Sequence, residues 1–71
     1  MNIPIMTPVD SSNLKSVGYD NQNLFVEFGK GTVYVYYNVP QELYLELLNA
    51  DSKGKYLNSN IKNVYQYERI H

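Results

Sequence analysis

Two runs of alternating apolar and polar side chains are joined by Gly29-Lys30-Gly31, and no other feature constrains the fold of this chain as strongly. Residues 24–28 place leucine, valine and phenylalanine at every second position, and residues 32–39 alternate in the same way. A period of two is typical of a half-buried β-strand. Two glycines supply the backbone freedom that a tight turn needs. The sequence therefore predicts a β-hairpin.

The second strand of this hairpin has two chemically different faces. One face carries Val33, Val35, Tyr37 and Val39, and the other carries Thr32, Tyr34, Tyr36 and Asn38. We expect the face of Val35 to pack against helices, because β-branched side chains fit a packed sheet surface. Two short helices can cover only one face, so Tyr34 and Tyr36 would be left open or be buried in an oligomer.

A third strand is predicted before the hairpin, at residues 13–19, and it completes an antiparallel meander. Leu14 and Val17 have odd spacing, so both can face inward only if a β-bulge lies near Lys15–Ser16. Residues 1–10 contain two prolines and are typical of an extended arm.

Helical spacing begins after Pro40, a residue that suits the first turn of a helix. The apolar positions recur every three or four residues and are Leu43, Leu47 and Ala50 in a first helix and Leu57, Ile61 and Val64 in a second. Asp51 or Ser52 can cap the second helix. Residues 65–70 alternate again and fit a short C-terminal strand.

The resulting prediction is one α+β domain over residues 1–71, of which residues 1–10 form an extended N-terminal arm. A three-stranded antiparallel β-meander is followed by two short α-helices packed on one face, with room for a short C-terminal strand. A chain of this length buries a small core, so we expect a marginal monomer that gains stability as a homo-oligomer, most simply a two-fold dimer.

Several chemistries are excluded by composition. The chain has no cysteine, and its one histidine is the last residue, His71. Disulfides, zinc sites and Ser-His or Cys-His catalysis therefore have no residues to use. The carboxylates show no spacing typical of an acid–base pair, so we expect no enzyme, no cofactor and no metal. No apolar run reaches the ~20 residues that span a bilayer, and no signal peptide is evident, so we expect a cytoplasmic protein without membrane contact.

The charge is nearly balanced but unevenly distributed. Six Lys and Arg residues stand against seven Asp and Glu residues, a net charge of −1, which does not suit broad neutralisation of nucleic acid phosphates. Residues 51–71, however, carry four cations and two carboxylates, a net of +2. We therefore expect any anion-binding surface in the last third of the chain.

An ordered series of short segments resembles the KTSC domain family, which is named for its place at the C-terminus of some lysyl-tRNA synthetases and also occurs as a small stand-alone bacterial or phage protein. The segments are Pro8-Val9-Asp10-Ser11-Ser12-Asn13-Leu14, Val17-Gly18-Tyr19-Asp20, Val26-Glu27-Phe28, Tyr34-Val35-Tyr36, Val39-Pro40, Ser52-Lys53-Gly54-Lys55-Tyr56-Leu57-Asn58 and Ile61-Lys62. The resemblance covers residues 8–70, and Leu57 departs from it where an aromatic residue is expected. It implies RNA binding, the activity proposed for the family, and brings no catalytic residues.

Two groups of residues could carry such binding. Tyr34 and Tyr36 could stack a base, although tyrosine is also a good strand former on a half-buried face. Ser52-Lys53-Gly54-Lys55 begins a helix, where free N–H groups, the helix dipole and two ammonium groups attract phosphate. The alternative for this segment is a capped helix with solvated lysines. Lys62 and Arg69 would also meet phosphate.

Asn58 is the last candidate binding residue. It could line a polar pocket with Ser11, Ser12 and Asn13, or these three residues could instead satisfy backbone groups where the arm enters the sheet.

Two functional hypotheses remain open. The first is a small non-enzymatic binding module for RNA or a nucleotide-like, phosphate-bearing ligand. The alternative is a self-assembling or protein-interaction protein, such as a phage protein that acts on a host component. A ligand platform leaves the tyrosines accessible, whereas an oligomer interface buries them.

Overall fold

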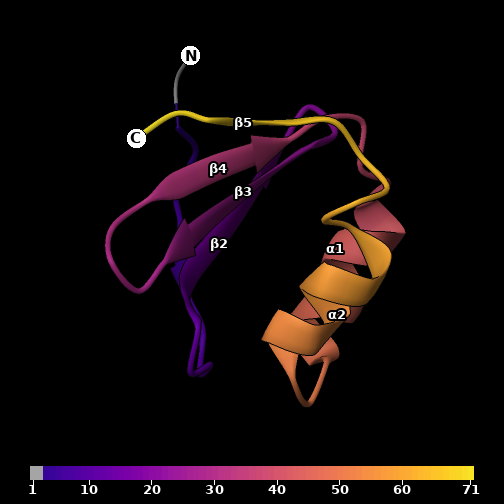
Figure 1. Ribbon diagram of the computed structural model, residues 1–71. Coiled ribbons are helices and arrows are strands. Elements are labelled where there is room, and N and C mark those ends of the chain that lie inside the picture. The colour runs from indigo at the N-terminus through magenta and orange to yellow at the C-terminus, as the bar shows by residue number, and fades with distance from the viewer. Residues whose placement is uncertain (1–2) are drawn as a thin grey trace.

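The hairpin expected around the Gly-Lys-Gly turn forms the centre of the sheet in the computed structural model, which describes residues 3–71 (Figure 1). The backbone nitrogen of Phe28 donates to the carbonyl oxygen of Thr32 at 2.8 Å and closes a loop of residues 29–31. Gly31 lies at φ 89°, a conformation that is inexpensive only without a Cβ. The predicted turn chemistry is therefore confirmed.

The described residues form one antiparallel sheet and two helices. In chain order the elements are β1 (Thr7–Pro8), β2 (Leu14–Asp20), β3 (Asn23–Phe28), β4 (Val33–Tyr36), α1 (Gln41–Asn49), α2 (Lys53–Asn60) and β5 (Tyr67–Arg69). The strands lie in the sheet in the order β1-β2-β3-β4-β5. The α+β class and the C-terminal strand are confirmed.

The sheet is wider than the predicted three-stranded meander. Part of the N-terminal arm pairs with β2 as the edge strand β1, with Thr7 opposite Val17. At the other edge β5 pairs with β4. The predicted bulge is also present, because the register between β2 and β3 shifts between Leu14 and Ser16. The sheet therefore has five strands, two of them short edges.

The helices cover the tyrosine face of β4, so the prediction that Val35 faces the helices is wrong. Leu24 lies opposite Tyr36, and Val26 lies opposite Tyr34. Cross-strand partners share a face of the sheet. Since Leu24 and Val26 belong to the core under the helices, both tyrosines lie on that side too. The three-residue loop fixes this register, and strand alternation alone does not reveal it.

Val35 instead lies on the opposite face, where it is opposite Phe25 and both side chains are buried. The N-terminal arm packs against this face at Gly18, which is in register with Phe25. A Cβ on Gly18 would lie 2.7 Å from the sulfur of Met6 and 3.1 Å from Pro4. The N-terminal arm therefore covers part of the sheet face that the helices leave open.

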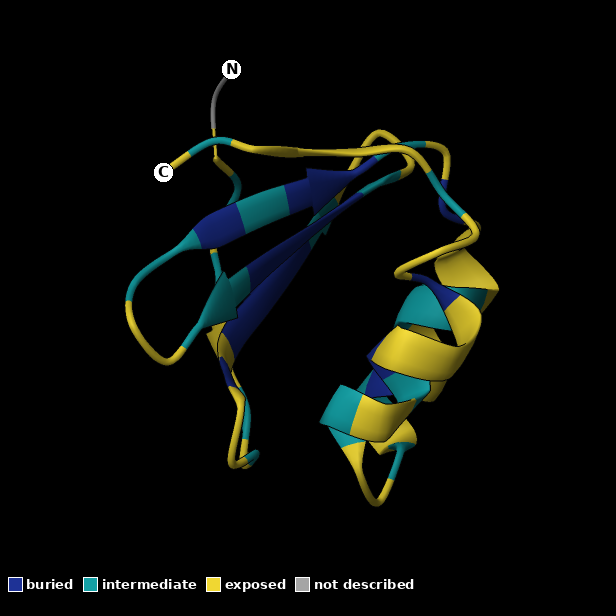
Figure 2. Ribbon diagram, viewed as in Figure 1, coloured by how far each residue is buried: buried dark blue, intermediate teal, exposed yellow. Residues whose placement is uncertain are grey.

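Each of the two helices contributes one deeply buried side chain, and the rest of its surface is intermediate or exposed (Figure 2). Leu47 from α1 and Leu57 from α2 are buried in the core. Ser52 caps α2, as predicted, by accepting a hydrogen bond from the backbone nitrogen of Lys55 at 3.4 Å. The helix ends at Asn60, so Val64 does not continue its apolar stripe and is 65% exposed.

Candidate ligand-binding groove

Four aromatic rings gather on the sheet face beside α2. The register that places Tyr34 and Tyr36 under the helices also pairs Tyr36 with Tyr67 of β5. The rings of Tyr34 and Tyr67 are stacked, with centroids 5.6 Å apart and planes at 14°. Phe28 meets Tyr34 edge-on at 5.6 Å. These residues come from β3, β4 and β5, so the sheet holds the aromatic cluster in place.

The rings differ sharply in exposure. Tyr36 is 1% exposed and belongs to the core, whereas Tyr67 is 51% exposed. The pKa of Tyr36 is raised to about 12. Burial is the main cause, and the nearby hydroxyls of Tyr34 and Tyr67 contribute to the same shift. Tyr67, which we did not single out from the sequence, is the ring of this cluster that offers an open surface for stacking.

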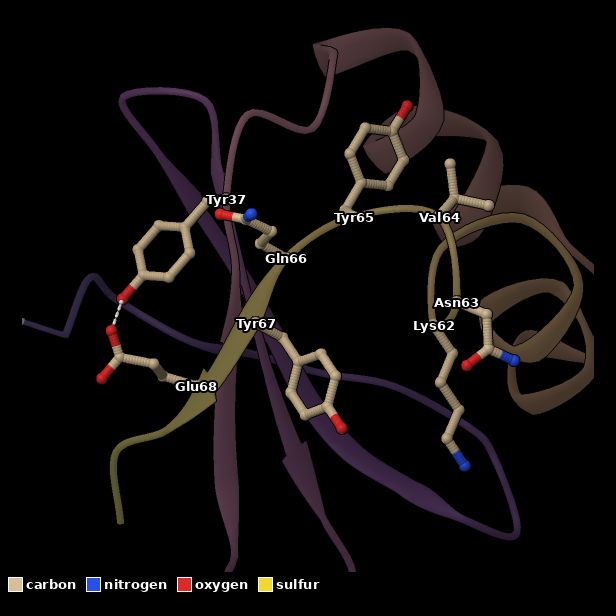
Figure 3. Close-up of a pocket in the computed structure, with 8 residues that line it drawn as sticks. All are labelled: Tyr37, Lys62, Asn63, Val64, Tyr65, Gln66, Tyr67 and Glu68. Carbon is tan, nitrogen blue, oxygen red and sulfur yellow. Dashed lines mark hydrogen bonds between the residues drawn. The ribbon is translucent and has the colours of Figure 1, made fainter.

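A cavity of 470 Å³, which we call the aromatic hollow, opens over these rings between the sheet and α2. Its lining includes Phe28, Tyr34, Tyr36 and Tyr67 from the sheet, Leu57 and Asn58 from α2, and the lysines Lys30 and Lys62. Figure 3 shows the side chains of Tyr67 and Lys62 extending in the same direction. The hollow therefore combines aromatic surface with two positive charges.

A second cavity, the polar hollow, has a volume of 440 Å³ and shares Phe28, Lys30, Leu57 and Asn58 with the first. Ser12, Asn13 and Gly54 also line it, so two of the three polar residues that could form a pocket with Asn58 share a cavity with it. The oxygen Oγ of Ser11 accepts bonds from the backbone nitrogens of Asn13 and Leu14, both at 3.3 Å, and so satisfies backbone groups.

Gly54 allows α2 to approach the turn before β2 closely. A Cβ there would lie 3.1 Å from the amide nitrogen Nδ2 of Asn13. Any side chain at position 54 would therefore crowd the polar hollow. This gives the glycine within the predicted helix-start segment a specific role, which is to keep the polar hollow open.

The other residues of that helix start do not line either hollow. Ser52 is engaged in capping, and the ammonium of Lys53 donates to the carbonyl oxygen of Ala50 at 3.2 Å. Lys55 is exposed and lines none of the cavities described. Arg69 lies opposite Tyr34 in the sheet, but its Nε donates to the carbonyl oxygen of His71 at 3.3 Å.

Five of the nine predicted site residues thus line the two joined hollows, namely Tyr34, Tyr36, Gly54, Asn58 and Lys62, whereas Ser52, Lys53, Lys55 and Arg69 do not. The sequence reasoning missed Lys30 and Tyr67. Lys30 is the middle residue of the hairpin turn, and only the packing of α2 beside that turn makes it part of the site. Tyr67 could have been found from the alternation of residues 65–70.

A third, shallow cavity of 620 Å³, the C-terminal hollow, adjoins the aromatic hollow at Lys62 and Tyr67 (Figure 3). Tyr37 and Glu68 line its far side, where the Tyr37 hydroxyl donates to Oε1 of Glu68 at 2.7 Å. This bond is the main cause that raises the pKa of Tyr37. The C-terminal hollow therefore ends at a carboxylate.

Two kinds of feature are absent from residues 3–71. No group of three or more His, Asp or Glu side chains there is arranged to hold a metal ion. Within the same part of the chain, no helix is long and apolar enough to cross a membrane.

Comparisons with known proteins agree with the resemblance seen in the sequence. A sequence model of the KTSC domain matches residues 10–67. A protein of Stutzerimonas stutzeri is 46% identical over 65 residues, which cover 87% of this chain and 92% of that protein. The lysine–tRNA ligase of Trichormus variabilis is 39% identical over 69 residues, which cover 94% of this chain but 12% of the ligase. A crystal structure of a KTSC domain protein from Yersinia pestis matches with a TM-score of 0.90 at 32% identity, covering 94% of this chain and 97% of that one.

Proposed function

The chain belongs to the KTSC domain family, and from this premise we propose that it is a small non-enzymatic module that binds RNA or a nucleotide-like, phosphate-bearing ligand in the aromatic hollow. One observation carries the proposal: the half-exposed ring of Tyr67 lies in the same cavity as Lys30 and Lys62. An open aromatic face beside cations is the combination that single-stranded nucleic acids and nucleotides require.

The binding mechanism follows from the aromatic stack. A base would lie on the open face of Tyr67, whose other neighbours in the stack are Tyr34 and Tyr36. Because the buried rings hold Tyr67 in place, little side-chain entropy is lost on binding. Stacking of this kind contributes about 1–3 kcal/mol per base. Lys30 and Lys62 would meet the phosphate.

The similarity to lysine–tRNA ligases supports RNA as the source of the ligand, since those relatives are named for a reaction on tRNA. The match covers 12% of each ligase, so a segment of this size accompanies the larger enzyme. A module that holds an RNA strand suits such a position, and it would act in the cytoplasm, where that RNA is found.

The net charge of −1 sets the expected affinity. Without a broad basic surface, the protein would hold a short stretch of ligand through a local site. A site with two lysines makes few phosphate contacts, so the logarithm of the affinity should fall with the logarithm of salt concentration with a slope of only about −1 to −2.

A charge-matched pair of double variants tests the proposal. In one, Lys30 and Lys62 become alanine, and in the other Lys53 and Lys55 become alanine, so both proteins lose two positive charges. Titration of labelled hexauridylate at low salt should show a loss of binding for the first variant and near-wild-type binding for the second. The reverse result would move the anion site to the start of α2. If the wild type itself fails to bind, the RNA or nucleotide proposal is wrong.

A second candidate function, self-association or binding to another protein, is favoured by the exposed arm. Ile3 is 46% exposed and Ile5 is 94% exposed, although isoleucine is usually buried. A homo-oligomer or a partner such as a host protein would cover these side chains. Sedimentation at tens of micromolar tests this candidate, since a species of 8.3 kDa alone would remove the case for a homo-oligomer.

A further inference from the structure

The aromatic and polar hollows together offer more room than one nucleotide needs. Their volumes are 470 and 440 Å³, and each lies within the range of about 300–1,000 Å³ typical of a site for one small molecule. They adjoin along α2, where Leu57 and Asn58 line both. A single nucleotide in the aromatic hollow would therefore leave the polar hollow empty.

The two lysines are placed at the two ends of the aromatic hollow. Lys30 lines both the aromatic and the polar hollow, so it lies at their junction. Lys62 lines both the aromatic and the C-terminal hollow and marks the opposite end. A strand crossing the aromatic hollow would meet a cation before and after the ring of Tyr67. Such spacing suits two successive phosphates.

Beyond Lys30, polar side chains join an apolar lining of Leu14, Phe28 and Leu57. The polar hollow presents the side-chain amides of Asn13 and Asn58 and the hydroxyl of Ser12. Amides can donate to and accept from a base edge at once, and a hydroxyl can bond a ribose 2′-OH. In the other direction the C-terminal hollow reaches around β5, because Glu68 pairs with Val35 and lies on the sheet face opposite Tyr67, so it does not continue the binding face.

We propose that the groove takes a single-stranded oligonucleotide and holds two adjacent units, one stacked on Tyr67 in the aromatic hollow and the next in the polar hollow, with Lys30 at the phosphodiester that joins them. This inference rests on the proposed function and adds to it the size of the binding site and the direction in which the strand continues. A lone mononucleotide would fill half of this site.

A length series tests the inference. The wild type is titrated at one low salt concentration with uridine 5′-monophosphate, with 5′-phosphorylated di-, tri- and hexauridylate, and with the matching deoxyuridine series. We expect affinity to rise about tenfold or more from one unit to two, and to change less than about threefold from two units to six. A gain confined to the RNA series assigns the ligand to RNA, and an equal gain in both series assigns it to single strands of either kind.

Two asparagine variants localise the second unit. Asn13→Ala should lower dinucleotide affinity to about that of the mononucleotide without changing mononucleotide affinity. Asn63→Ala, an exposed residue of the C-terminal hollow, is the matched control and should change neither affinity.

The outcomes separate the inference from the function on which it rests. Equal affinity for one unit and two would overturn the two-unit site and leave the proposed function standing. Affinity that rises steadily through six units would also overturn it, because the protein would then contact more than two units of the strand. Failure of every ligand to bind would reject the proposed function as well.

Discussion

Tyr34, Tyr36 and Tyr67 share one face of the sheet, yet their exposure assigns them different tasks. Tyr36 is buried among the core residues, Tyr34 is half-buried beneath the stack, and Tyr67 is half-exposed at its surface. Burial of an aromatic ring contributes to folding, whereas an exposed ring is available to a ligand. Replacement by alanine should therefore destabilise the fold at Tyr36 and weaken ligand binding at Tyr67.

We expect Tyr67→Ala to weaken oligonucleotide binding by about 5- to 150-fold, the equivalent of one lost base stack, with a small change in thermal stability. Tyr36→Ala should instead destabilise the fold by about 3–5 kcal/mol, as removal of a buried aromatic side chain does. Titration of hexauridylate and urea denaturation of both variants check this division. A Tyr67→Ala protein that binds as the wild type does would show that Tyr67 is not the stacking surface.

Gly54 gives a second prediction at the scale of one residue. Replacing a helical glycine by alanine favours the helix by about 1 kcal/mol. The added Cβ would lie 3.1 Å from Nδ2 of Asn13, at the end of an exposed side chain that can shift. Gly54→Ala should therefore raise the melting temperature by a few degrees while it lowers dinucleotide affinity. Equal dinucleotide affinity in variant and wild type would mean that the Asn13 amide plays no part in binding.

The types of residue in the site were easier to predict than which of these residues lie together in the folded protein. Tyr34, Asn58 and Lys62 could be singled out because tyrosine, amide and lysine side chains suit bases and phosphates. Lys30 could not, because it joins the site only when the fold brings the hairpin turn and α2 to the same cavities. The alternation of residues 65–70 could have drawn attention to Tyr67, but its place beside Tyr36 depends on the register of β5 against β4.

At the scale of elements, local patterns predicted the strands β2 to β5, the bulge and the cap of α2, because each depends on neighbouring residues, whereas the pairing of β1 with β2 was not predicted. The face of β4 that meets the helices was assigned wrongly. That choice depends on the cross-strand register, which pairs Leu24 with Tyr36 and so brings the tyrosines inward. Val64 was misassigned because helical spacing continues in the sequence beyond Asn60, where the helix ends.

The contact between the N-terminal arm and the sheet gives a prediction at this scale. A Cβ on Gly18 would lie 3.1 Å from Pro4 and 3.3 Å from the carbonyl oxygen of Ile5, so the arm backbone would have to move away. We expect Gly18→Ala to destabilise the protein by about 1–3 kcal/mol, the usual cost of overpacking. Urea denaturation measures the change.

Gly29→Ala is the matched control for this substitution. Its nearest neighbour would be the carbonyl oxygen of Asn13 at 3.8 Å, an ordinary contact, and Gly29 is exposed. The free energy of unfolding should therefore change little. If both alanine variants lose the same stability, the close packing of the arm on Gly18 contributes nothing of its own.

For the whole molecule, an even charge balance combines with a local concentration of cations. The net charge of −1 gives no long-range attraction for nucleic acid, yet Lys30 and Lys62 line one cavity. The sequence predicted an anion-binding surface in residues 51–71, which carry a net positive charge and contain Lys62. Lys30, however, comes from residues 1–50, which carry a net negative charge. Folding, more than the linear charge distribution, therefore creates the positive part of the surface.

The stability of the whole domain should depend on alkaline pH through its buried tyrosine. Burial raises the pKa of Tyr36 from its ordinary value of 10.0 to about 12. Since the folded protein then holds this proton more tightly than the unfolded chain does, Tyr36 contributes stability that is fully present below pH 10 and is lost as the pH rises from about 10 through about 12. Tyr56, whose pKa is also raised to about 12 by burial and by its bond to Glu46, acts in the same direction.

Urea denaturation between pH 8 and pH 12, with absorbance of ionised tyrosine followed in parallel, measures this dependence. We expect a constant free energy of unfolding up to about pH 10 and a decline above it. Tyr36→Phe, which keeps the buried ring and removes the titrating hydroxyl, should show a shallower decline. Tyr56, Tyr37 and Tyr19, whose pKa values are also raised, contribute the remainder. If the free energy of unfolding of Tyr36→Phe declines with pH as that of the wild type does, the Tyr36 hydroxyl is not protected in the fold. That result would contradict the place of Tyr36 in the core beneath the Tyr34–Tyr67 stack.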